Sequence, residues 1–482
     1  MLTGLKKFAI LCHRWTGTAF CLLFTWWFVS GIFMMYVDYP EIKPADRLAH
    51  AAPIDTARVQ LTPLEAWAKL KTKGEPDEVR LRMFDGRPAY WFRLGKARAY
   101  VYADNGQLQV KFPPELNLRT ASAWAAQPAA SATAVKMRAA DQWTVGGLYY
   151  NYEPITKYSW PNGEQVYIPS ATGEVIQHTT RWSRMLAYAG PVAHWLYFTP
   201  LRKNPQLWSR IVIWLSGAAT AVALLGLFAG LTFYSPSRRI PFTGTKRLHM
   251  ILGLFFGFLA CTWAFSGMLS MDPFPIKVAG EDPRIPQALE GAPFAFENFT
   301  VKSPREALVE VSPLLSAREV EFSQVGVRSF YLVTQDADHS RVVPMTEAPS
   351  MEFDRAALLD FVTKASQPTG LTEARFIDEY DAHYLDRNRE LPLPVLFLRM
   401  KDAQQSTFYI DPRTTRVVGS YSSGRWPERW LYHGFHSINL PVLYKHRPAW
   451  DIAVLFLMLG GASLCVTSVV IAWRFIGRSV RL

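Results

Sequence analysis

Four long uncharged runs constrain the fold of this chain more than any other feature. They cover residues 15–37, 211–234, 250–271 and 452–473, and each has 22–24 residues without Asp, Glu, Lys or Arg. A helix needs about 20 apolar residues to cross the hydrocarbon core of a bilayer, and buried helices of soluble proteins are rarely so long and so uniformly apolar. The sequence therefore predicts four transmembrane helices.

The first run has some features of a secretory signal peptide, since Lys6 and Lys7 precede it and small residues occur at 29–31. However, His13 and Arg14 interrupt its beginning, and a related pattern recurs inside the chain, where no signal peptide acts. We therefore interpret residues 1–37 as an uncleaved membrane anchor.

The short flanks of the runs predict their direction. Lys and Arg, without Asp or Glu, occur in the N-terminus, the middle loop and the C-terminus, and the residues are Lys6, Lys7, Arg238, Arg239, Lys246, Arg247, Arg474, Arg478 and Arg481. Such flanks stay on the cytoplasmic side. Both termini and the middle loop are thus predicted to be cytoplasmic and the two large segments external. The net charge of +12 then reflects membrane orientation, and no nucleic-acid partner is expected.

Two pairs of matching patterns indicate an internal duplication. In the first and third runs, a histidine is followed by Gly, Trp, Ser and Gly at offsets of 4, 14, 17 and 18: His13, Gly17, Trp27, Ser30 and Gly31, and His249, Gly253, Trp263, Ser266 and Gly267. Before the other two runs, a histidine precedes a proline and, 14 residues later, a tryptophan: His194, Pro205 and Trp208, and His436, Pro448 and Trp450. The predicted fold is a four-span α-helical bundle built as a parallel two-fold repeat, with a pseudo-twofold axis along the membrane normal.

The external segments predict α+β domains. Helix-like stretches at 63–73 and 304–315 precede strand-like stretches at 89–94, 99–102 and 327–334, and a strand-turn pattern at 166–176 recurs at 408–418. Residues 104–106 read as a hairpin turn, and the Ala/Ser-rich 121–134 as a linker or loose helix. The four cysteines, Cys12, Cys21, Cys261 and Cys465, lie in or beside the apolar runs, so no disulfide or zinc site is expected outside the membrane. The predicted boundaries are 1–37, 208–234, 249–271 and 450–474 for the membrane helices, 38–207 and 272–449 for the external domains, 235–248 for the cytoplasmic loop and 475–482 for the tail.

Four histidines are candidate ligands of a cofactor. His13 and His249 are near the cytoplasmic face, whereas His194 and His436 precede their spans on the outer face. From His13 to Ser30 is 17 residues, about 26 Å of helix rise, so histidines of the two faces cannot share a ligand. The axis instead pairs His13 with His249 and His194 with His436.

Two histidines from facing helices, without nearby carboxylate or thiolate, favour haem b, because zinc takes three or four protein ligands. Gly17 and Gly253 follow their histidines by one turn on the same helix face, which leaves room for a flat macrocycle. Two alternatives remain: the histidines make only helix–helix hydrogen bonds, or they bind another cation or a proton.

The outer side has a second candidate, since His433 lies three residues before His436 on the same helical face. The 14-residue spacing to Trp450 favours His436 as the ligand, and His433 remains an alternative ligand or an outer-shell group. No catalytic acid, base or nucleophile is predicted. The remaining histidines are expected to be ordinary surface residues: His50, His178, His339, His383 and His446.

Several motifs together resemble the PepSY-associated transmembrane proteins of bacteria, and the resemblance covers nearly the whole chain. The motifs are HRWTG at 13–17 with the later Ser-Gly, HMILG at 249–253, DQWTV at 141–145, HWLYFTPLR at 194–202 and RWLYHGFHSINLP at 429–441. The family includes inner-membrane reductases that release iron from siderophores with two b haems. The resemblance implies a bacterial inner membrane, periplasmic PepSY-like domains at 38–207 and 272–449, and one-electron chemistry. The turn at 411–415 reads DPRTT where the first copy has SATGE, so a ligand shared by the two domains is not implied.

Three functions compete at this point. The first is a haem conduit that takes electrons from a quinol or a cytoplasmic reductase and reduces a periplasmic ferric chelate or siderophore for iron acquisition. The second is a membrane-bound PepSY binding or regulatory protein, which binds a peptide or restrains a protease and has no redox activity. The third, a transporter, is disfavoured because no charged residue lies within the spans. Aromatic residues near the outer histidines are candidates for an acceptor-docking surface or for the lipid-facing interfacial belt: Trp195, Tyr197, Trp430 and Tyr432.

Overall fold

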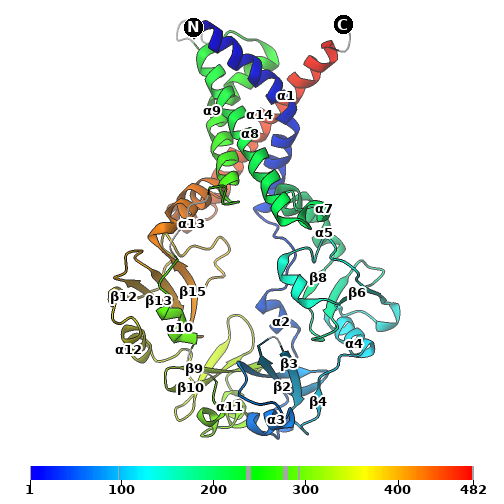
Figure 1. Ribbon diagram of the computed structural model, residues 1–482, viewed down its shortest axis with the longest axis vertical. Helices are drawn as coiled ribbons and strands as arrows, with labels where there is room; N and C mark the ends of the chain where they lie inside the picture. Colours follow the sequence, from blue (N-terminus) through cyan, green and yellow to red (C-terminus); the bar gives the residue numbers. More distant parts are fainter. Residues whose placement is uncertain (1, 96, 235–239, 275–279, 291–293, 480–482) are drawn as a thin grey trace.

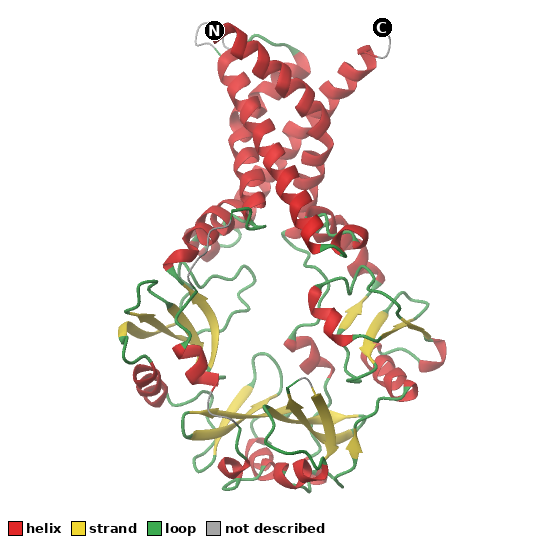
Figure 2. Ribbon diagram, viewed as in Figure 1, coloured by secondary structure: helices red, strands yellow, loops and turns green. Residues whose placement is uncertain are grey.

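The computed structural model in Figure 1 describes residues 2–95, 97–234, 240–274, 280–290 and 294–479. Arg238, Arg239 and Arg481, on which part of the predicted orientation depends, lie outside these residues. A helical bundle forms one end of the molecule, and three β-sheets lie beyond its other end (Figure 2). Both ends of the chain lie at the end of the bundle that is remote from the sheets (Figure 1).

The bundle contains four helices that are long and apolar enough to cross a membrane, which confirms the four predicted spans. They are α1 (Leu2–Met34), α8 (Pro205–Phe233), α9 (Gly244–Leu269) and α14 (Ala449–Ser479). Helix α1 begins well before the first uncharged run, because helical backbone hydrogen bonds do not require apolar side chains. The predicted prolines mark the starts of α8 and α14, since Pro205 is the first residue of α8 and Pro448 directly precedes α14.

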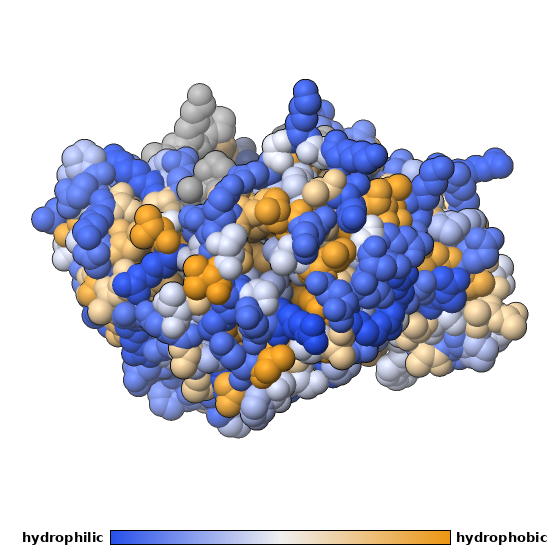
Figure 3. Space-filling model, turned by 90° about the horizontal axis from the view of Figure 1, so that it is seen from below, coloured by the Kyte–Doolittle hydropathy of each residue, from blue (hydrophilic) through white to orange (hydrophobic). Residues whose placement is uncertain are grey.

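Large apolar side chains cover the outside of the bundle. Trp214 of α8 is 77% exposed and Phe255 of α9 is 78% exposed. Exposed apolar area of this extent is unfavourable in water and is accommodated by lipid tails. The chain is accordingly a membrane protein. The end of the molecule that is remote from the bundle has a predominantly hydrophilic surface, as expected for a part in contact with water (Figure 3).

A seven-stranded antiparallel sheet joins the two external segments. Its order is β11-β10-β9-β1-β2-β3-β4. The first segment contributes β1 (Glu78–Phe84), β2 (Arg87–Leu94), β3 (Ala97–Tyr102) and β4 (Leu108–Gln109), and the second contributes β9 (Glu319–Val325), β10 (Arg328–Thr334) and β11 (Ser340–Pro344). At the junction β1 pairs with β9 in antiparallel register, with Leu81 opposite Val320.

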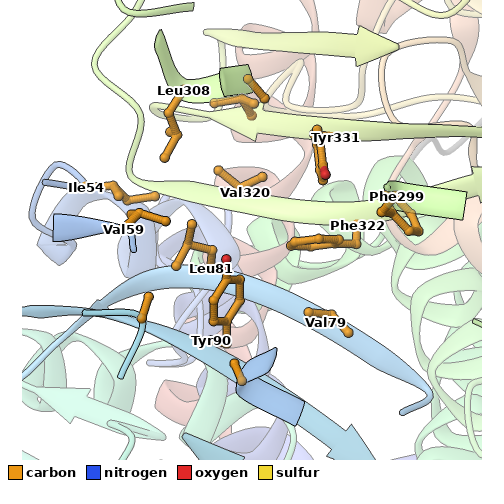
Figure 4. Packing of buried hydrophobic residues seen from close by; sticks show 14 of the residues in the cluster. Ile54, Val59, Val79, Leu81, Tyr90, Phe299, Leu308, Val320, Phe322 and Tyr331 are labelled. Carbon is orange, nitrogen blue, oxygen red and sulfur yellow. The ribbon is translucent and has the colours of Figure 1, made fainter. Parts of the chain in front are cut away.

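One hydrophobic core lies across this junction (Figure 4). Leu81, Tyr90, Val320 and Tyr331 are fully buried in it. Helices α3 (Pro63–Lys69) and α11 (Pro304–Val311) contribute buried residues to the same core. Each helix begins at a capping box, Thr62 with Glu65 and Ser303 with Glu306, which satisfies free backbone N–H groups. The β1–β9 pair therefore lies within a continuous core.

Two four-stranded sheets, the flanking sheets, lie on opposite sides of the molecule, between the central sheet and the bundle (Figure 1). One contains β5 (Thr133–Lys136), β6 (Ile155–Ser159), β7 (Gln165–Pro169) and β8 (Gln177–Thr179). The other contains β12 (Leu371–Ile377), β13 (Val395–Met400), β14 (Thr407–Asp411) and β15 (Arg416–Tyr421). Ion pairs connect each of them to the central sheet: Arg82 of β1 with Glu174, and Arg416 of β15 with Glu321 of β9.

Most predicted external elements are present, but the two helices are shorter than expected, whereas strands β2 and β3 begin earlier than expected. The helix expected at 63–73 ends at Lys69, and Lys71 adopts a positive φ of 52°. The helix expected at 304–315 ends at Val311, because Pro313 has no backbone N–H with which to continue the helical hydrogen bonds. The segment 121–134 contains the end of α4 (Pro114–Ala125), a short 3-10 turn and the start of β5. Tertiary pairing with β6 gives the last part its extended form.

Candidate functional site

Short helices connect the flanking sheets to the bundle and carry the outer histidines. After β8 come α5 (Arg181–Ala189), α6 (Pro191–His194) and α7 (Thr199–Arg202), and after β15 come a π-helical segment (Pro427–Gly434) and α13 (Pro441–Lys445). Trp208 Nε1 donates to the Trp195 carbonyl at 2.9 Å, and Trp450 Nε1 donates to the Ile438 carbonyl at 3.1 Å. The two tryptophans of the repeated spacing thus tie each histidine segment to the beginning of its span.

The outer histidines lie together. The ring centres of His194 and His436 are 5.9 Å apart, with an interplanar angle of 67°. His194 Nδ1 lies 3.2 Å from Ser30 Oγ of α1 and 3.2 Å from the Trp27 carbonyl, and His436 Nδ1 lies 3.1 Å from Ser266 Oγ of α9. Each outer imidazole is therefore held by a serine of the repeated sequence pattern, Ser30 of α1 or Ser266 of α9.

The glycine after each of these serines faces the imidazole, and Gly31 also makes room for the Met458 side chain. A Cβ added to Gly31 would lie 3.5 Å from His194 Cε1 and 2.3 Å from the Met458 methyl carbon. A Cβ added to Gly267 would lie 3.4 Å from His436 Cε1. In each Ser-Gly pair of the repeated pattern, the serine is a hydrogen-bond partner of the imidazole and the glycine lies next to the same ring.

The inner histidines also lie together, near the opposite end of the bundle. The ring centres of His13 and His249 are 6.4 Å apart and the rings are nearly parallel, at 27°. His13 Nδ1 lies 3.2 Å from the Val222 carbonyl of α8, and His249 Nδ1 lies 3.1 Å from Thr467 Oγ1 of α14. The second and fourth spans, α8 and α14, therefore hold the inner rings, whereas the first and third spans, α1 and α9, hold the outer rings.

Gly17 and Gly253, which were predicted to make room for a macrocycle, are not in tight contact with neighbouring side chains. A Cβ on Gly17 would meet His13 Cε1 at 3.8 Å, and one on Gly253 would meet Leu464 at 3.8 Å, both ordinary contact distances. A glycine that the sequence patterns do not include is tighter, since a Cβ on Gly226 of α8 would lie 2.6 Å from His13 Cε1. Gly226 is thus the glycine that lets the His13 ring lie against α8.

The hydrogen bonds of the four rings suit metal ligation through Nε2. All four Nδ1 atoms have a partner, whereas within the part of the chain that the structure describes no hydrogen bond involves an Nε2 of these rings. Ligating histidines usually donate the second ring N–H to a carbonyl or another acceptor, which fixes the tautomer and ring orientation. Metal–imidazole bonds are about 2.0 Å long, so two imidazoles on opposite sides of one iron have ring centres about 6 Å apart. Both observed separations fit that arrangement.

A cavity of ≈ 620 Å³ adjoins the outer pair, and both His194 and His436 line it. Its apolar wall includes Trp27, Trp263 and other side chains of the bundle. The polar part of its wall comes mostly from the second external segment, and further polar side chains come from Tyr197, Ser216 and Ser270. The residues of the second external segment are Asp386, Arg387, Asn388, Tyr432, His433, Ser437, Asn439 and Tyr444. An apolar interior with polar groups on one side suits an amphipathic ligand such as a macrocycle with carboxylate substituents.

His433 lines this cavity but is not paired with another histidine ring. The Tyr432 ring lies between the two neighbours, 4.7 Å from the His433 ring and 5.4 Å from the His436 ring. Burial lowers the pKa of His194 to about 3 and that of His436 to about 4, so both rings are neutral at neutral pH, the form that binds metals. The pairing with His194 favours His436 over His433 as the ligand.

The other five histidines lie among the external domains. Four have local partners that need no functional explanation: His50 stacks on Trp124, His178 contacts Glu164, His339 contacts Asp336, and His446 contacts the Val442 carbonyl. His383 is only half-exposed, and its ring stacks on Tyr421 with centres 3.7 Å apart. It is therefore part of the packing beneath the π-helical segment.

Sequence reasoning missed the groups that hold the inner pair. Val222 acts through its backbone carbonyl, which any residue provides, and Thr467 has no counterpart of the same type on α8. Neither produces a repeated pattern that a sequence comparison within the chain would show. Across the described residues, no group of three or more His, Cys, Asp or Glu side chains is arranged to hold a metal ion.

No model of a known protein family matches the chain, and no curated protein matches it. The functional interpretation therefore depends on the geometry of the two histidine pairs.

Proposed function

We propose that the protein is an inner-membrane haem b protein that carries electrons across the bilayer and reduces a periplasmic acceptor. The observation that carries this proposal is the presence of two histidine pairs, with ring centres 5.9 and 6.4 Å apart, in which every Nδ1 has a hydrogen-bond partner. A protein that used these histidines only for helix packing would not need both pairs at the spacing of two axial ligands.

The matching contacts of the two halves support a parallel repeat in this proposal. Ser30 with His194 and Ser266 with His436 are the same residue types at nearly the same distance, 3.2 and 3.1 Å. Each histidine pair then contains one histidine from each half. A cofactor bound between the two histidines of a pair would therefore lie on the proposed pseudo-twofold axis. The external domains are PepSY-like in the same proposal.

Each part of the site has a distinct role in this mechanism. Haem b, if bound, would be held by His13 with His249 and by His194 with His436, and it would supply one-electron redox chemistry there. Ser30, Ser266 and Thr467 keep their imidazoles in a fixed orientation and tautomer. His13 and Ser30 both lie on α1, about 26 Å apart along its axis, so the two sites would form a relay.

The acceptor is a ferric chelate, such as a ferric siderophore, in this proposal. The segments that carry His194 and His436 lie where the bundle meets the flanking sheets (Figure 1). A bulky polar chelate can approach this level without entering the hydrocarbon core. Both termini lie at the other end, where a quinol or a cytoplasmic reductase would supply electrons to the His13 and His249 site.

An absorption spectrum of the purified protein tests the cofactor. We expect a reduced-minus-oxidised b-type spectrum and two haems per chain. Replacement of His13 or His249 by Ala should remove one haem, and replacement of His194 or His436 the other, because each iron would lose an axial ligand. His339→Ala is the matched control, since this exposed histidine contacts only Asp336 outside the bundle.

Two results would change the assignment. Loss of the outer haem in His433→Ala, with retention in His436→Ala, would make His433 the ligand. Full haem content in all four single variants, or no haem in the wild-type protein, would favour the PepSY binding or regulatory function instead.

A further inference from the structure

Arg429 is a buried cation near the outer pair. The residue is 8% exposed and lies seven positions before His436, in the π-helical segment. Its Nε donates to the Ala382 carbonyl and its Nη2 to the Asn439 carbonyl at 3.0 Å, whereas Nη1 has no hydrogen-bond partner among the described residues. Burial lowers the pKa of Arg429, but an arginine remains protonated at neutral pH.

The charge of Arg429 is incompletely neutralised. Its ring contact is with Trp430, whose centre is 4.4 Å from the guanidinium carbon, and such a contact carries no negative charge. Asp381 attracts Arg429 from a distance, but its carboxylate already accepts hydrogen bonds from the Tyr409 hydroxyl and two backbone N–H groups. No ion pair joins Arg429 to any carboxylate that the structure describes. A buried charge without a bound partner is costly, so its presence here calls for a role.

The field of this charge reaches the cavity at the outer pair. Asn439, whose carbonyl accepts from Arg429, lines the cavity together with His436. His433 lines it as well. Burial lowers the pKa of His433, the Glu428 charge raises it, and the Arg429 charge lowers it further. A positive charge in this poorly solvated region acts over a longer distance than it would in water.

In the part of the chain that the structure describes, no such buried cation accompanies the inner pair. In the first half, the position seven residues before His194 is Ala187, which is fully buried. The arginines closest in sequence to the inner pair, Arg14 and Arg247, are both exposed. Their fields are screened by water and salt, whereas that of Arg429 is not.

We propose that Arg429 sets the reduction potential of the outer haem site above that of the inner site and so directs electrons outward. This inference rests on the proposed function. One electron that reaches the outer site adds one negative charge there, while no bond forms or breaks. The guanidinium lowers the free energy of this more negative state and thereby raises the potential of the site.

A potentiometric titration of the purified haem-loaded protein tests this inference. Arg429→Gln should shift the outer midpoint to a lower potential, Arg429→Lys should keep it closer to the wild-type value, and the inner midpoint should stay unchanged in both. Arg425→Gln is the matched control, because Arg425 lies in the preceding turn and its charge is paired with Glu428 at 2.8 Å and Glu281 at 3.4 Å.

Asn439→Asp provides a second variant that keeps the guanidinium in place. It adds a carboxylate of nearly the same shape to a residue that lines the cavity, and it should also lower the outer midpoint, even if Arg429→Gln fails to retain the outer haem. The inference is overturned if Arg429→Gln or Asn439→Asp leaves the outer midpoint at the control value. It is also overturned if Arg429→Lys shifts it as far as Arg429→Gln, which would indicate a purely structural role. Absence of haem from the wild-type protein would overturn the proposed function itself.

Discussion

At the scale of single residues, the repeated patterns predicted the histidines of both pairs, and they contained the two serines that hold the outer pair without indicating that role. Ser30 and Ser266 occur at the same offset from their histidines, and the structure gives both the same contact with an outer imidazole. The inner pair was less predictable, because its partners are a backbone carbonyl on α8 and a threonine on α14. Gly226 was missed for the same reason, since a single glycine in an apolar span has no distinguishing pattern.

The serine contacts lead to a prediction about haem affinity. Ser30→Ala and Ser266→Ala each remove a hydroxyl that lies within 3.2 Å of an outer Nδ1. Loss of such an outer-shell partner typically weakens metal binding by about 10–100-fold. We expect this loss at the outer haem only, measured by titration of haem into the apoprotein.

Ser463→Ala is the control for this prediction, because Ser463 is exposed on α14 and bonds only to the Leu459 carbonyl. Equal outer-haem affinity in all three serine variants would mean that the hydroxyls do not support the ligands.

At the scale of elements, α5 has an unusual arrangement of apolar side chains. Trp182, Met185 and Tyr188 are exposed along one side of this nine-residue helix, and Trp182 is 64% exposed. The helix lies between the β5–β8 sheet and the bundle (Figure 1). A short helix with an apolar stripe, next to a membrane-spanning bundle, is typical of a segment in the lipid headgroup region. Its type was not predicted from the sequence, because a stripe of three residues is too short to distinguish a lipid-facing helix from a buried one.

Spin labels test the position of α5. A label at Met185→Cys should be more accessible to oxygen, which concentrates in lipid, than to a polar nickel chelate. A label at Val327→Cys, which is 96% exposed in the turn between β9 and β10, should show the opposite preference. Both measurements need a background without the four native cysteines, which lie in the membrane helices. Preferential access of the nickel chelate at both sites would place α5 in water.

At the scale of the whole molecule, the sequence predicted four spans and two mixed external segments, but it did not predict how the segments join. The β1–β9 register depends on edges that are more than 200 residues apart, and alternation within each strand is compatible with many partners. The cavity at the outer pair was unpredictable for a similar reason, since its wall combines the four spans with residues of both external segments.

The two levels of histidines lead to a prediction about direction. In proteoliposomes with reductant on the cytoplasmic side and an impermeant ferric chelate outside, His13→Ala should leave the outer haem bound but deprive it of electrons. His436→Ala should leave the inner haem reducible and abolish reduction of the chelate. Both variants should therefore lose most of the chelate-reducing activity. Their spectra should differ, because one variant retains the outer haem and the other retains the inner haem. Activity equal to that of the wild type in both variants would show that electrons do not follow this route.

The β1–β9 pair also has a consequence for biosynthesis. Strand β1 is synthesised early, yet its partner follows only after two more membrane helices, α8 and α9, have been made. During that interval β1 offers unpaired backbone N–H and C=O groups, and the adjoining half of the core, around Leu81 and Tyr90, lacks its cover from the second external segment. The first half can thus associate with other chains until β9 has been synthesised. Once β1 pairs with β9, the two halves form one folding unit.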